Sequence, residues 1–590
     1  MALKDLFILL AIAIIGLHCE DDKEWWRTAT FYQIYPRSFM DTTGNGIGDI
    51  QGMIRRLDHL KDAGFDTFWL SPIFKSPQVD TGYDVSDYYQ IEPDYGTMED
   101  FDNLVKKAKE LGIRLMLDFI PNHTSDLHDW FQRSKNNETE YRDFYVWHDG
   151  HPNPIPGEQP LLPNNWLSVF GGPAWTWVET RQQYYLHQFY PQQPDLNYRH
   201  DKVREEMSAM LKFYIDKGVS GYRLDAINHL YEDDQFRDEP HSDHLEEGQE
   251  PKYYDDLQHI HTKDLNDTFL FVYNWRDMID KYRAEKNITT DILVMTEAYA
   301  STYDTMRYYR SPTDRNVRGA HMPFNFQLIF NFWSDAKSEH VRNGIFEWLK
   351  NMPEGESANW VAGSHDHSRV GSRVAPEKIH MVNTVVLTLP GASITYYGEE
   401  IGMHDNNDVP NWDGRNKNRT PMQWNGGNGA GFTSRRYNDT WLPIHPNYHT
   451  INLQSQREKQ VSTYKYFQSL TKLRKGRVIR EGSFDFQIIN EYVFGYTREF
   501  KDEEGYLIII NTSGMEQHVS LSNFTTLGND TLRVLTAAPN SRFKVGEFVG
   551  KNDVTLGLYD AVVFHYTASA SSIVLSIKLL LSSIFVFLFN

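Results

Sequence analysis

Cysteine is almost absent, because Cys19 is the only one in a chain of 590 residues. We therefore expect the mature protein to contain no disulfide, which would be unusual for a secreted protein. A chain of this length can bury enough apolar surface to fold without such cross-links. It also has room for one large domain with one or two smaller ones.

Positive charge is also scarce, because 59 Lys and Arg face 80 Asp and Glu and leave a formal net charge of −21. Nucleic-acid partners require a basic surface, so this composition excludes them. An acidic surface suits a soluble protein in an ion-rich extracellular fluid. Aromatic residues, by contrast, make up 14% of the chain. Such rings pack in cores and interfaces, and they also stack against the C–H faces of sugars.

Both ends of the chain resemble processing signals. The apolar residues 6–17 follow Lys4 and are too few to span a bilayer, so we predict a secretory signal peptide over residues 1–19. At the other end, small residues precede a hydrophobic tail with no basic stop signal, which predicts a GPI-attachment signal over residues 568–590. A transmembrane anchor is the alternative, but Lys578 would cost about 3 kcal/mol inside a membrane. We expect the protein on the outer face of the cell membrane.

N-glycosylation is expected in such a compartment. Asn122 and Asn418 match the acceptor pattern, but both lie in segments that we assign to the active site, where a glycan would block function. The predicted acceptors are Asn137, Asn266, Asn287, Asn438, Asn511, Asn523 and Asn529.

Strand-like apolar segments alternate with amphipathic helical segments along most of the chain. This alternation predicts parallel strands joined by right-handed crossovers. Eight strands are predicted, the number that a closed (β/α)8 TIM barrel needs. They cover residues 31–36, 65–72, 113–120, 221–226, 292–298, 321–326, 359–366 and 392–400.

Two regions depart from this alternation. Residues 124–197 are rich in Pro, Gly, Asn and Trp and are too long for a βα loop, so we predict a small domain inserted after the third strand. The pattern changes again at residues 479–567, where alternating strands predict a C-terminal antiparallel β-sandwich domain. The barrel would then comprise residues 20–123 and 198–478, with a long irregular loop at 403–455.

Four of the hydrophobic segments end on polar residues of the kind that enzymes use. They cover residues 115–123, 221–227, 292–299 and 360–367. A single Asp at the end of a strand is more often a helix cap or a turn residue than a catalyst. In a (β/α)8 barrel, however, the chemistry lies at the carboxyl ends of the strands, so these segments together predict an active site.

Three of these segments each supply one carboxylate, namely Asp225, Glu297 and Asp366. Arg223 and Asp225 are two residues apart on one strand, so their side chains share a face. Burying them in a barrel would be costly unless they are paired. Paired carboxylates with an adjacent Arg suit the cleavage of glycosidic bonds.

These segments resemble the conserved regions of the α-amylase superfamily, glycoside hydrolase family 13, and the resemblance covers nearly the whole mature chain. Supporting motifs are YQIYPRSF (32–39), GYDVSDY (82–88), QPDLNY (193–198) and RTPMQW (419–424). QPDLN and RTPMQW resemble the exo-acting α-glucosidase and oligo-1,6-glucosidase branch. With its predicted terminal signals, the chain is most similar to insect gut maltases, particularly the membrane-anchored mosquito ones.

The resemblance implies an exo-acting, retaining α-glucosidase that releases glucose from maltose, short malto-oligosaccharides or sucrose. It implies that Asp225 is the nucleophile, that Glu297 is the general acid and then the base, and that Asp366 binds sugar hydroxyls. Ser364 is a departure, since the family usually has Asn before His-Asp. The implied substrate-binding residues are Tyr83, Asp84, His123, Arg223, His365 and Arg419.

The residue after the nucleophile, Ala226, bears on linkage. In relatives a bulkier Val at this position accompanies α-1,6 cleavage, while Ala or Thr accompanies α-1,4 cleavage. We therefore expect maltose to be hydrolysed better than isomaltose.

A loop with oxygen donors at alternate positions predicts a structural cation. Ca²⁺ and Mg²⁺ prefer such ligands, and related glucosidases hold one of these ions in the corresponding loop. A Gly-rich turn without metal is the alternative. The predicted ligands are Asp41, Thr43, Asn45, the Ile47 carbonyl and Asp49.

Other classes of function remain open from sequence alone. One is a non-catalytic relative such as the heavy subunit of an amino-acid transporter, but such proteins carry a membrane helix and a cysteine for a subunit disulfide, which we do not find here. Another is an anchored glycoprotein that also serves as a docking receptor, as mosquito relatives do for a bacterial toxin. The sequence does not decide the oligomeric state, and a homodimer is one option.

Overall fold

A computed structural model describes residues 23–246, 248–410, 414–435, 439–500, 504–528 and 531–567. The predicted signal peptide, the predicted GPI signal, and the acceptors Asn438 and Asn529 lie outside these ranges. Within them, no helix combines the length and the apolar character needed to cross a membrane.

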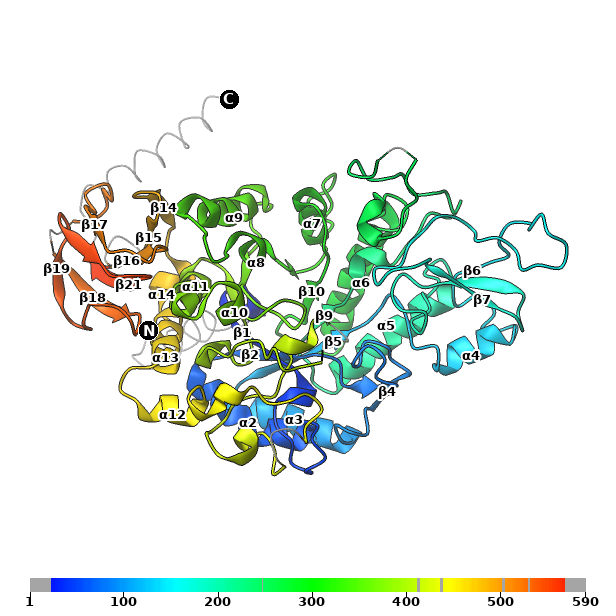
Figure 1. The fold of residues 1–590 in the computed structure, drawn as a ribbon, viewed down its shortest axis with the longest axis horizontal. Helices are drawn as coiled ribbons and strands as arrows, with labels where there is room; N and C mark the ends of the chain where they lie inside the picture. The colour runs from blue at the N-terminus through cyan, green and yellow to red at the C-terminus, as the bar shows by residue number, and fades with distance from the viewer. Residues whose placement is uncertain are drawn as a thin grey trace, which may run out of the picture. The chain divides into compact units, whose positions relative to one another are not determined.

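An eight-stranded parallel sheet has the order β11-β10-β9-β5-β2-β1-β13-β12. Figure 1 labels its strands β1, β2, β5, β9 and β10. The first strand therefore pairs with the last, as in a (β/α)8 barrel, and the TIM-barrel class is confirmed. All eight predicted strands are present. Their bounds are β1 (Thr30–Ile34), β2 (Thr67–Leu70), β5 (Arg114–Phe119), β9 (Gly221–Leu224), β10 (Leu293–Thr296), β11 (Met322–Pro323), β12 (Asn359–Val361) and β13 (Ala392–Tyr396).

Helix boundaries follow local sequence signals. Helix α2 (Ile50–Ala63) begins after Asp49, whose side chain accepts a hydrogen bond from Gly52 N, and it ends at Gly64, which has φ of 97°. Helix α3 (Met98–Leu111) begins with a capping box formed by Thr97 and Asp100. These signals explain why the chain turns from strand to helix at the positions where the amphipathic pattern begins.

By its internal contacts the chain forms two compact units, which are described separately below. Of the described residues, the first unit comprises residues 23–25, Trp69–Phe324 and Asn351–Glu356. The second comprises Trp26–Phe68, Asn325–Lys350 and the described residues from Ser357 to Thr567.

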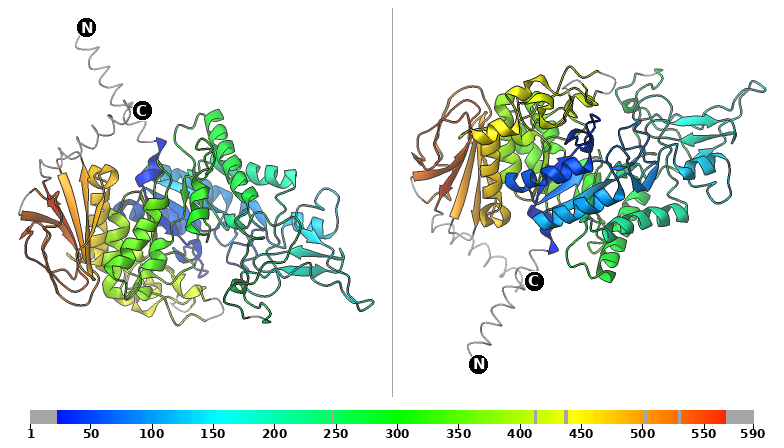
Figure 2. Two further views of the ribbon diagram at one scale, coloured as in Figure 1. Left: turned by 90° about the horizontal axis from the view of Figure 1, so that it is seen from above. Right: turned by 90° about the horizontal axis from the view of Figure 1, so that it is seen from below.

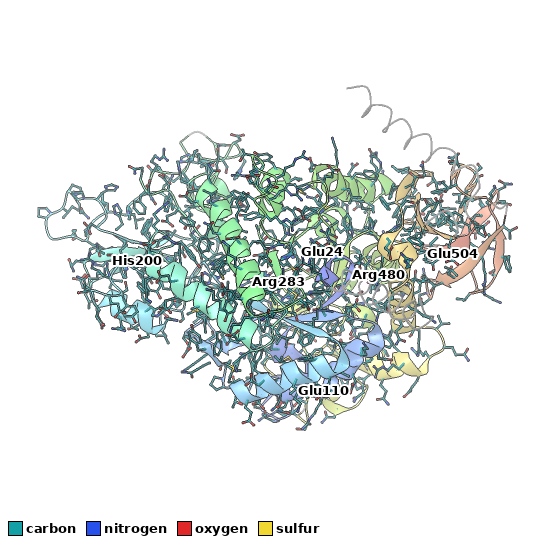
Figure 3. All side chains as sticks on the ribbon, turned by 180° about the vertical axis from the view of Figure 1, so that it is seen from behind. Glu24, Glu110, His200, Arg283, Arg480 and Glu504 are labelled. Carbon is teal, nitrogen blue, oxygen red and sulfur yellow. The ribbon has the colours of Figure 1, made fainter. Side chains whose placement is uncertain are left out.

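The first unit contains β5, β9, β10 and β11, and the region 124–197 lies within it. That region forms a small antiparallel sheet with the order β6-β8-β7 and packs Trp166 against Trp175 with ring centroids 5.8 Å apart. The remaining elements of the unit are β3 (Phe74–Lys75), β4 (Asp87–Ile91), α4 (Asp129–Lys135), β6 (Trp147–His148), β7 (Trp175–Val178), β8 (Gln183–Leu186), α5 (Asp201–Asp216), α6 (Asn266–Glu285) and α7 (Thr302–Tyr309). Glu110 on α3, His200 before α5 and Arg283 on α6 are labelled in Figure 3.

The second unit contains β1, β12 and β13 and continues into a six-stranded antiparallel sheet with the order β14-β15-β16-β21-β18-β19, coloured orange to red in Figure 2. This confirms the predicted C-terminal antiparallel domain. Its strands are β14 (Asp485–Ile488), β15 (Val493–Phe500), β16 (Glu504–Asn511), β17 (Gln517–Val519), β18 (Thr531–Ala537), β19 (Phe548–Gly550), β20 (Val554–Leu556) and β21 (Ala561–Tyr566).

Apolar residues on one face of these strands, such as Leu507, Ile509 and Phe564, form the core of the C-terminal domain. Strands β17 and β20 pair with each other as a separate ribbon. Besides α2, the α-helices of the second unit are α8 (Gln327–Asn331), α9 (Ser338–Asn351), α10 (Val370–Arg373), α11 (Ile379–Thr388), α12 (Leu453–Glu458), α13 (Thr463–Arg474) and α14 (Arg477–Glu481).

Candidate active site

In the first unit, Arg223 on β9 lies at the centre of three carboxylates. Its Nη1 atom is 2.9 Å from Asp118 Oδ1 and also donates to Asp225 Oδ1. Its Nη2 atom is 3.6 Å from Glu297 Oε2. The guanidinium is buried, so little water screens these charges from one another. The four residues form one electrostatic cluster.

Hydrogen bonds donated by backbone N–H groups join the ends of β9 and β10 at this cluster. Glu297 N donates to Leu224 O at 2.9 Å, and Ala226 N donates to Glu297 Oε2 at 2.9 Å. Ala226 has φ of 46°, in the left-handed region, so the chain turns immediately after Asp225. Asp225 and Glu297 are thus presented side by side from neighbouring strands.

Burial raises the pKa values of Asp118 and Asp225, whereas the positive charge of Arg223 lowers them. Burial raises the pKa of Asp118 to about 6, although Arg223 favours its ionised form. Burial also raises the pKa of Asp225, the Arg223 guanidinium lowers it, and the neighbouring Glu297 raises it. Three acids share one cation, so a proton on one carboxyl changes the affinity of the others for protons. Such an arrangement suits one carboxylate acting as a nucleophile beside another acting as an acid.

Two predicted binding residues are linked to this cluster. Tyr83 donates its hydroxyl to Asp118 Oδ2 at 2.9 Å, and His123 Nε2 is 3.1 Å from Tyr83 O. Burial lowers the pKa of His123 to about 3, so the imidazole is neutral near pH 7. His123 Nδ1 is 2.9 Å from Asn122 Oδ1. The ring is therefore fixed by neighbours on both sides.

Asp84 is held within its own loop. Its carboxylate accepts hydrogen bonds from Ser76 Oγ at 2.9 Å, Val79 N at 2.9 Å and Asp80 N at 3.0 Å. Burial raises its pKa, and these donors oppose that shift. These contacts fix the carboxylate in place, and none of them joins it to the Arg223 cluster.

In the second unit, the segment after β12 forms another charged group. Asp366 Oδ1 is 3.0 Å from Arg419 Nη2 and 3.3 Å from Arg415 Nη1, and Asp366 Oδ2 is 3.2 Å from His365 Nε2. Arg419 is fully buried and also donates Nε to His365 O at 2.8 Å. His365 Nδ1 lies 2.8 Å from Gln33 Nε2 on β1. The structure therefore brings together all three residues predicted here, namely His365, Asp366 and Arg419.

Sequence reasoning missed Asp118 and Arg415. Asp118 lies inside the apolar run 115–120, and a single acid within a buried strand was the available signal. Arg415 lies in an irregular segment, and no motif marks it. Ser364, which replaces the usual Asn, accepts a hydrogen bond from Asp366 N at 3.2 Å and lies 3.0 Å from His367 Nδ1. It therefore supports the turn that carries Asp366.

The predicted metal loop has the chemistry that a hard cation needs. Asp41 accepts from Gly44 N at 2.7 Å and Gly46 N at 2.9 Å, and Asp49 accepts from Thr42 N at 2.6 Å. Both carboxylates are buried, and neither forms an ion pair with a Lys or Arg in the part of the chain that the structure describes. Buried carboxylates without a cationic partner favour a bound cation. All the predicted donors are oxygens, so the residues fit Ca²⁺ or Mg²⁺.

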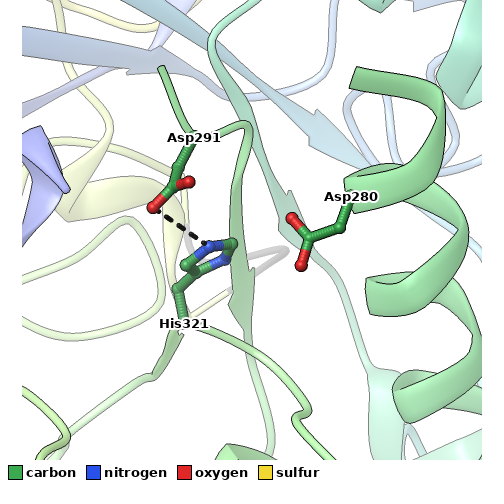
Figure 4. A group of neighbouring side chains, drawn as sticks. All are labelled: Asp280, Asp291 and His321. Carbon is green, nitrogen blue, oxygen red and sulfur yellow. Dashed lines mark ion pairs between the residues drawn. The ribbon is translucent and has the colours of Figure 1, made fainter. Parts of the chain in front are cut away.

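Another acidic group lies at the start of β10 in the first unit. Asp280, Asp291 and His321 place potential ligand atoms within 4.8 Å of one another, and His321 Nε2 is 3.8 Å from Asp291 Oδ2 (Figure 4). Arg276 Nε is 2.8 Å from Asp280 Oδ2, and Arg283 Nη2 is 3.6 Å from Asp291 Oδ1. Two guanidinium groups therefore already balance these carboxylates, which favours an ion-pair network over a metal.

The predicted glycosylation sites differ in accessibility. Asn511 is fully buried, and its Nδ2 atom donates to Met515 O and Gly557 O, both at 2.7 Å. No hydrogen of its amide remains for a glycan, so the structure argues against modification at Asn511. The exposed acceptors are Asn137, Asn266, Asn287 and Asn523.

A parallel eight-stranded barrel sheet that presents clustered acids at its strand ends has the architecture and the side chains that a glycoside hydrolase needs. The family model "Alpha amylase, catalytic domain" matches residues 33–482. The chain belongs to this family.

Relatives support this assignment over the full length. The "Alpha-glucosidase" of Culex pipiens is 50% identical over 580 residues, covering 98% of this chain and 97% of the relative. "Maltase 1" of Drosophila virilis is 44% identical over 568 residues, covering 93% and 88%. The crystal structure of Bacillus licheniformis trehalose-6-phosphate hydrolase superimposes with a TM-score of 0.78 at 30% identity, covering 92% of this chain and 100% of that one.

Proposed function

We propose that this protein is an exo-acting, retaining α-glucosidase, a maltase that releases glucose from the non-reducing ends of maltose and short malto-oligosaccharides, with sucrose as a further substrate. The observation that carries the proposal is the contact of Arg223 with both Asp225 and Glu297 at the ends of adjacent strands. The names of the relatives, α-glucosidase and maltase, agree with it.

In the first step, the Asp225 carboxylate attacks the anomeric carbon while Glu297 donates its proton to the leaving glycosidic oxygen. A covalent glucosyl–enzyme ester forms as the glycosidic bond breaks. In the second step, Glu297 removes a proton from water, which attacks the anomeric carbon and releases α-glucose and the Asp225 carboxylate. Arg223 favours the ionised form of Asp225, which attacks in the first step and is released again as the leaving group in the second.

The remaining binding residues are proposed to recognise the non-reducing glucose. Asp366 has two guanidinium neighbours, Arg415 and Arg419, whose charge-assisted contacts fix the direction of its carboxyl group. A carboxylate held in this way can accept hydrogen bonds from sugar hydroxyls. We propose that Asp84 and Arg419 each bind sugar hydroxyls and that the Tyr83 ring stacks against a sugar face.

The test uses the purified protein with maltose, maltotriose, sucrose and isomaltose, and ¹H NMR to record the anomer of glucose as it is released. We expect α-glucose from maltose, and β-glucose as the first product would contradict retention. Asp225→Asn and Glu297→Gln should lower kcat by about 10²–10⁴ or more without loss of fold. Glu110→Gln on the exposed face of α3 is the matched control and should leave kcat unchanged. Activity of either catalytic variant within tenfold of wild type would refute the assignment.

We also propose that the loop from Asp41 to Asp49 holds one Ca²⁺, with Mg²⁺ as the alternative. Asp41, Thr43, Asn45, Asp49 and the carbonyl of Ile47 would supply its ligands. The support is the pair of buried carboxylates without a cationic partner in the described structure. The role is structural, since no step of the reaction needs a metal.

We propose that a GPI anchor attaches the protein to the outer face of the cell membrane. The support is the sequence of residues 568–590, which lie outside the described structure. Phosphatidylinositol-specific phospholipase C should release the protein from cells that express it. Release by detergent only would favour a transmembrane tail instead.

A further inference from the structure

A basic pocket in the second unit is not part of the proposed active site. It has a volume of about 480 Å³ and lies between α2, Trp424 and the segment of α12 and α13. Four cationic side chains and two carboxylates line it, namely Arg55, Arg56, Arg457, Lys465, Asp58 and Asp62. An excess of positive charge in one pocket is unexpected in a chain with a net charge of −21.

The two carboxylates of the pocket balance at most half of this positive charge. Arg457 Nη2 is 2.8 Å from Asp62 Oδ2. Arg55, Arg56 and Lys465 form no ion pair with any residue in the described ranges. The pocket therefore keeps net positive charge for a ligand from outside the chain.

Arg56 is rigidly held at the wall of the pocket. Its guanidinium lies 4.4 Å from the centroid of the Trp424 ring, and its Nη2 atom donates to Gly431 O at 3.3 Å. Trp424 is itself buried and donates Nε1 to Phe39 O at 2.7 Å. A guanidinium fixed in this way loses little side-chain entropy when it binds an anion.

Arg56 and Arg457 also repel each other. Burial lowers the pKa of Arg56, and the positive charge of Arg457 lowers it further. An anion bound next to both groups would relieve this repulsion.

We propose that this pocket binds a tetrahedral oxyanion, a phosphate or sulfate group that is either inorganic or carried as an ester by a small molecule. Arg and Lys recognise such groups through charge-assisted hydrogen bonds, and the planar fork of Arg matches two oxygens at once. The volume exceeds what a bare ion fills, so an organic ester is accommodated as well. The site is independent of the glucosidase reaction.

The experiment measures the melting temperature and isothermal titration of the full-length protein with sodium phosphate, with chloride at the same ionic strength as the reference. We expect a saturable rise in melting temperature with phosphate and none beyond salt screening with chloride. Glycerol 3-phosphate, with glycerol as its control, distinguishes an ester site from a site for the inorganic ion.

Three variants identify the pocket as the site. Lys465→Gln should weaken phosphate binding about tenfold, because it removes one charge-assisted contact. Arg56→Lys keeps the charge but removes the fork, so it should weaken binding less than Arg56→Gln does. Lys472→Gln makes the same charge change on an exposed position of α13 outside the pocket, and it should bind phosphate as wild type does.

Two outcomes would overturn the proposal. One is a phosphate effect no larger than that of chloride. The other is equal phosphate affinity in Lys465→Gln and Lys472→Gln, which would show that the anion binds elsewhere.

Discussion

Asp118 Oδ1 lies 2.9 Å from Arg223 Nη1, and both side chains are buried. Asp118 therefore competes with Asp225 for the same guanidinium nitrogen, and its negative charge raises the pKa of Asp225. Asp118 is a positioning residue: it sets how strongly Arg223 acts on the proposed nucleophile.

Asp118→Asn tests this role. Removing the charge should lower the pKa of Asp225, so the acidic limb of the kcat/KM profile should move to lower pH by about one unit. kcat should also fall, because Arg223 is then held more closely by Asp225 and weakens it as a nucleophile. The measurement is the pH profile of maltose hydrolysis from pH 4 to 8.

Asp102→Asn is the control for this variant. Asp102 forms an exposed pair with Lys217 at 2.8 Å, which is worth about 0–1 kcal/mol. The Asp102→Asn variant should leave the pH profile of maltose hydrolysis unchanged. A profile of Asp118→Asn that coincides with this control would show that Asp118 does not tune the nucleophile.

Ala226→Val should shift the preference from maltose towards isomaltose, as the resemblance implies. Discrimination from one such contact is limited to about 1–3 kcal/mol, so the change should be incomplete. The substitution should also lower the stability of the folded protein, because Ala226 has φ of 46°, where a β-branched side chain is strained by about 1–2 kcal/mol. We therefore expect a lower melting temperature together with the altered ratio of kcat/KM values.

Ala226→Gly separates the effect on linkage preference from the effect of backbone strain on stability. Glycine adopts a positive φ without strain, so its melting temperature should not fall by the same amount. The native enzyme should still prefer maltose. A native preference for isomaltose would make the linkage interpretation wrong.

Removal of metal should destabilise the loop from Asp41 to Asp49. We expect EGTA to lower the melting temperature and added Ca²⁺ to restore it. Asp49→Asn removes a ligand charge but keeps a residue that caps α2, so it should abolish the response to chelator. Thr43→Asp adds an anionic ligand and should tighten Ca²⁺ binding. Indifference of the wild-type melting temperature to EGTA would argue for a metal-free turn.

Acid should destabilise the region 124–197 through buried histidine. Burial lowers the pKa of His187 to about 4, below the value near 6.5 of an unfolded chain. The unfolded state therefore binds the proton more tightly, and the contribution of His187 to stability is complete above pH 6.5 and is lost as the pH falls towards 4. The maximum slope is about 1.4 kcal/mol per pH unit.

His187→Gln keeps a polar group for Thr176 and Phe189 but cannot titrate. Between pH 6.5 and 4 its melting temperature should fall less steeply than that of wild type, as calorimetry can record. His241→Gln, at an exposed position, serves as the control and should follow the wild-type slope. Parallel slopes for all three proteins would contradict the assignment.

Some of the site could be predicted because its signal is local. Asp225 and Glu297 follow apolar runs, and the periodicity of those runs locates the ends of β9 and β10. Asp118 carries the same kind of signal, but an acid inside a strand does not reveal whether its partner is Arg223 or a solvent-exposed group. Arg415 carries no signal, because irregular segments have no period from which a direction could be inferred.

By itself the sequence determined the eight parallel strands, the C-terminal antiparallel domain and the candidate acids, because strand and helix periods and strand-terminal polar residues are properties of short segments. Only the tertiary structure decided which charges meet. Arg223 contacts Asp118 from a strand 105 residues away, Asn511 is buried by its own β domain, and Arg56 and Arg457 line the same pocket. Such contacts join residues far apart in the chain, and their energies depend on burial and distance, which no local pattern encodes.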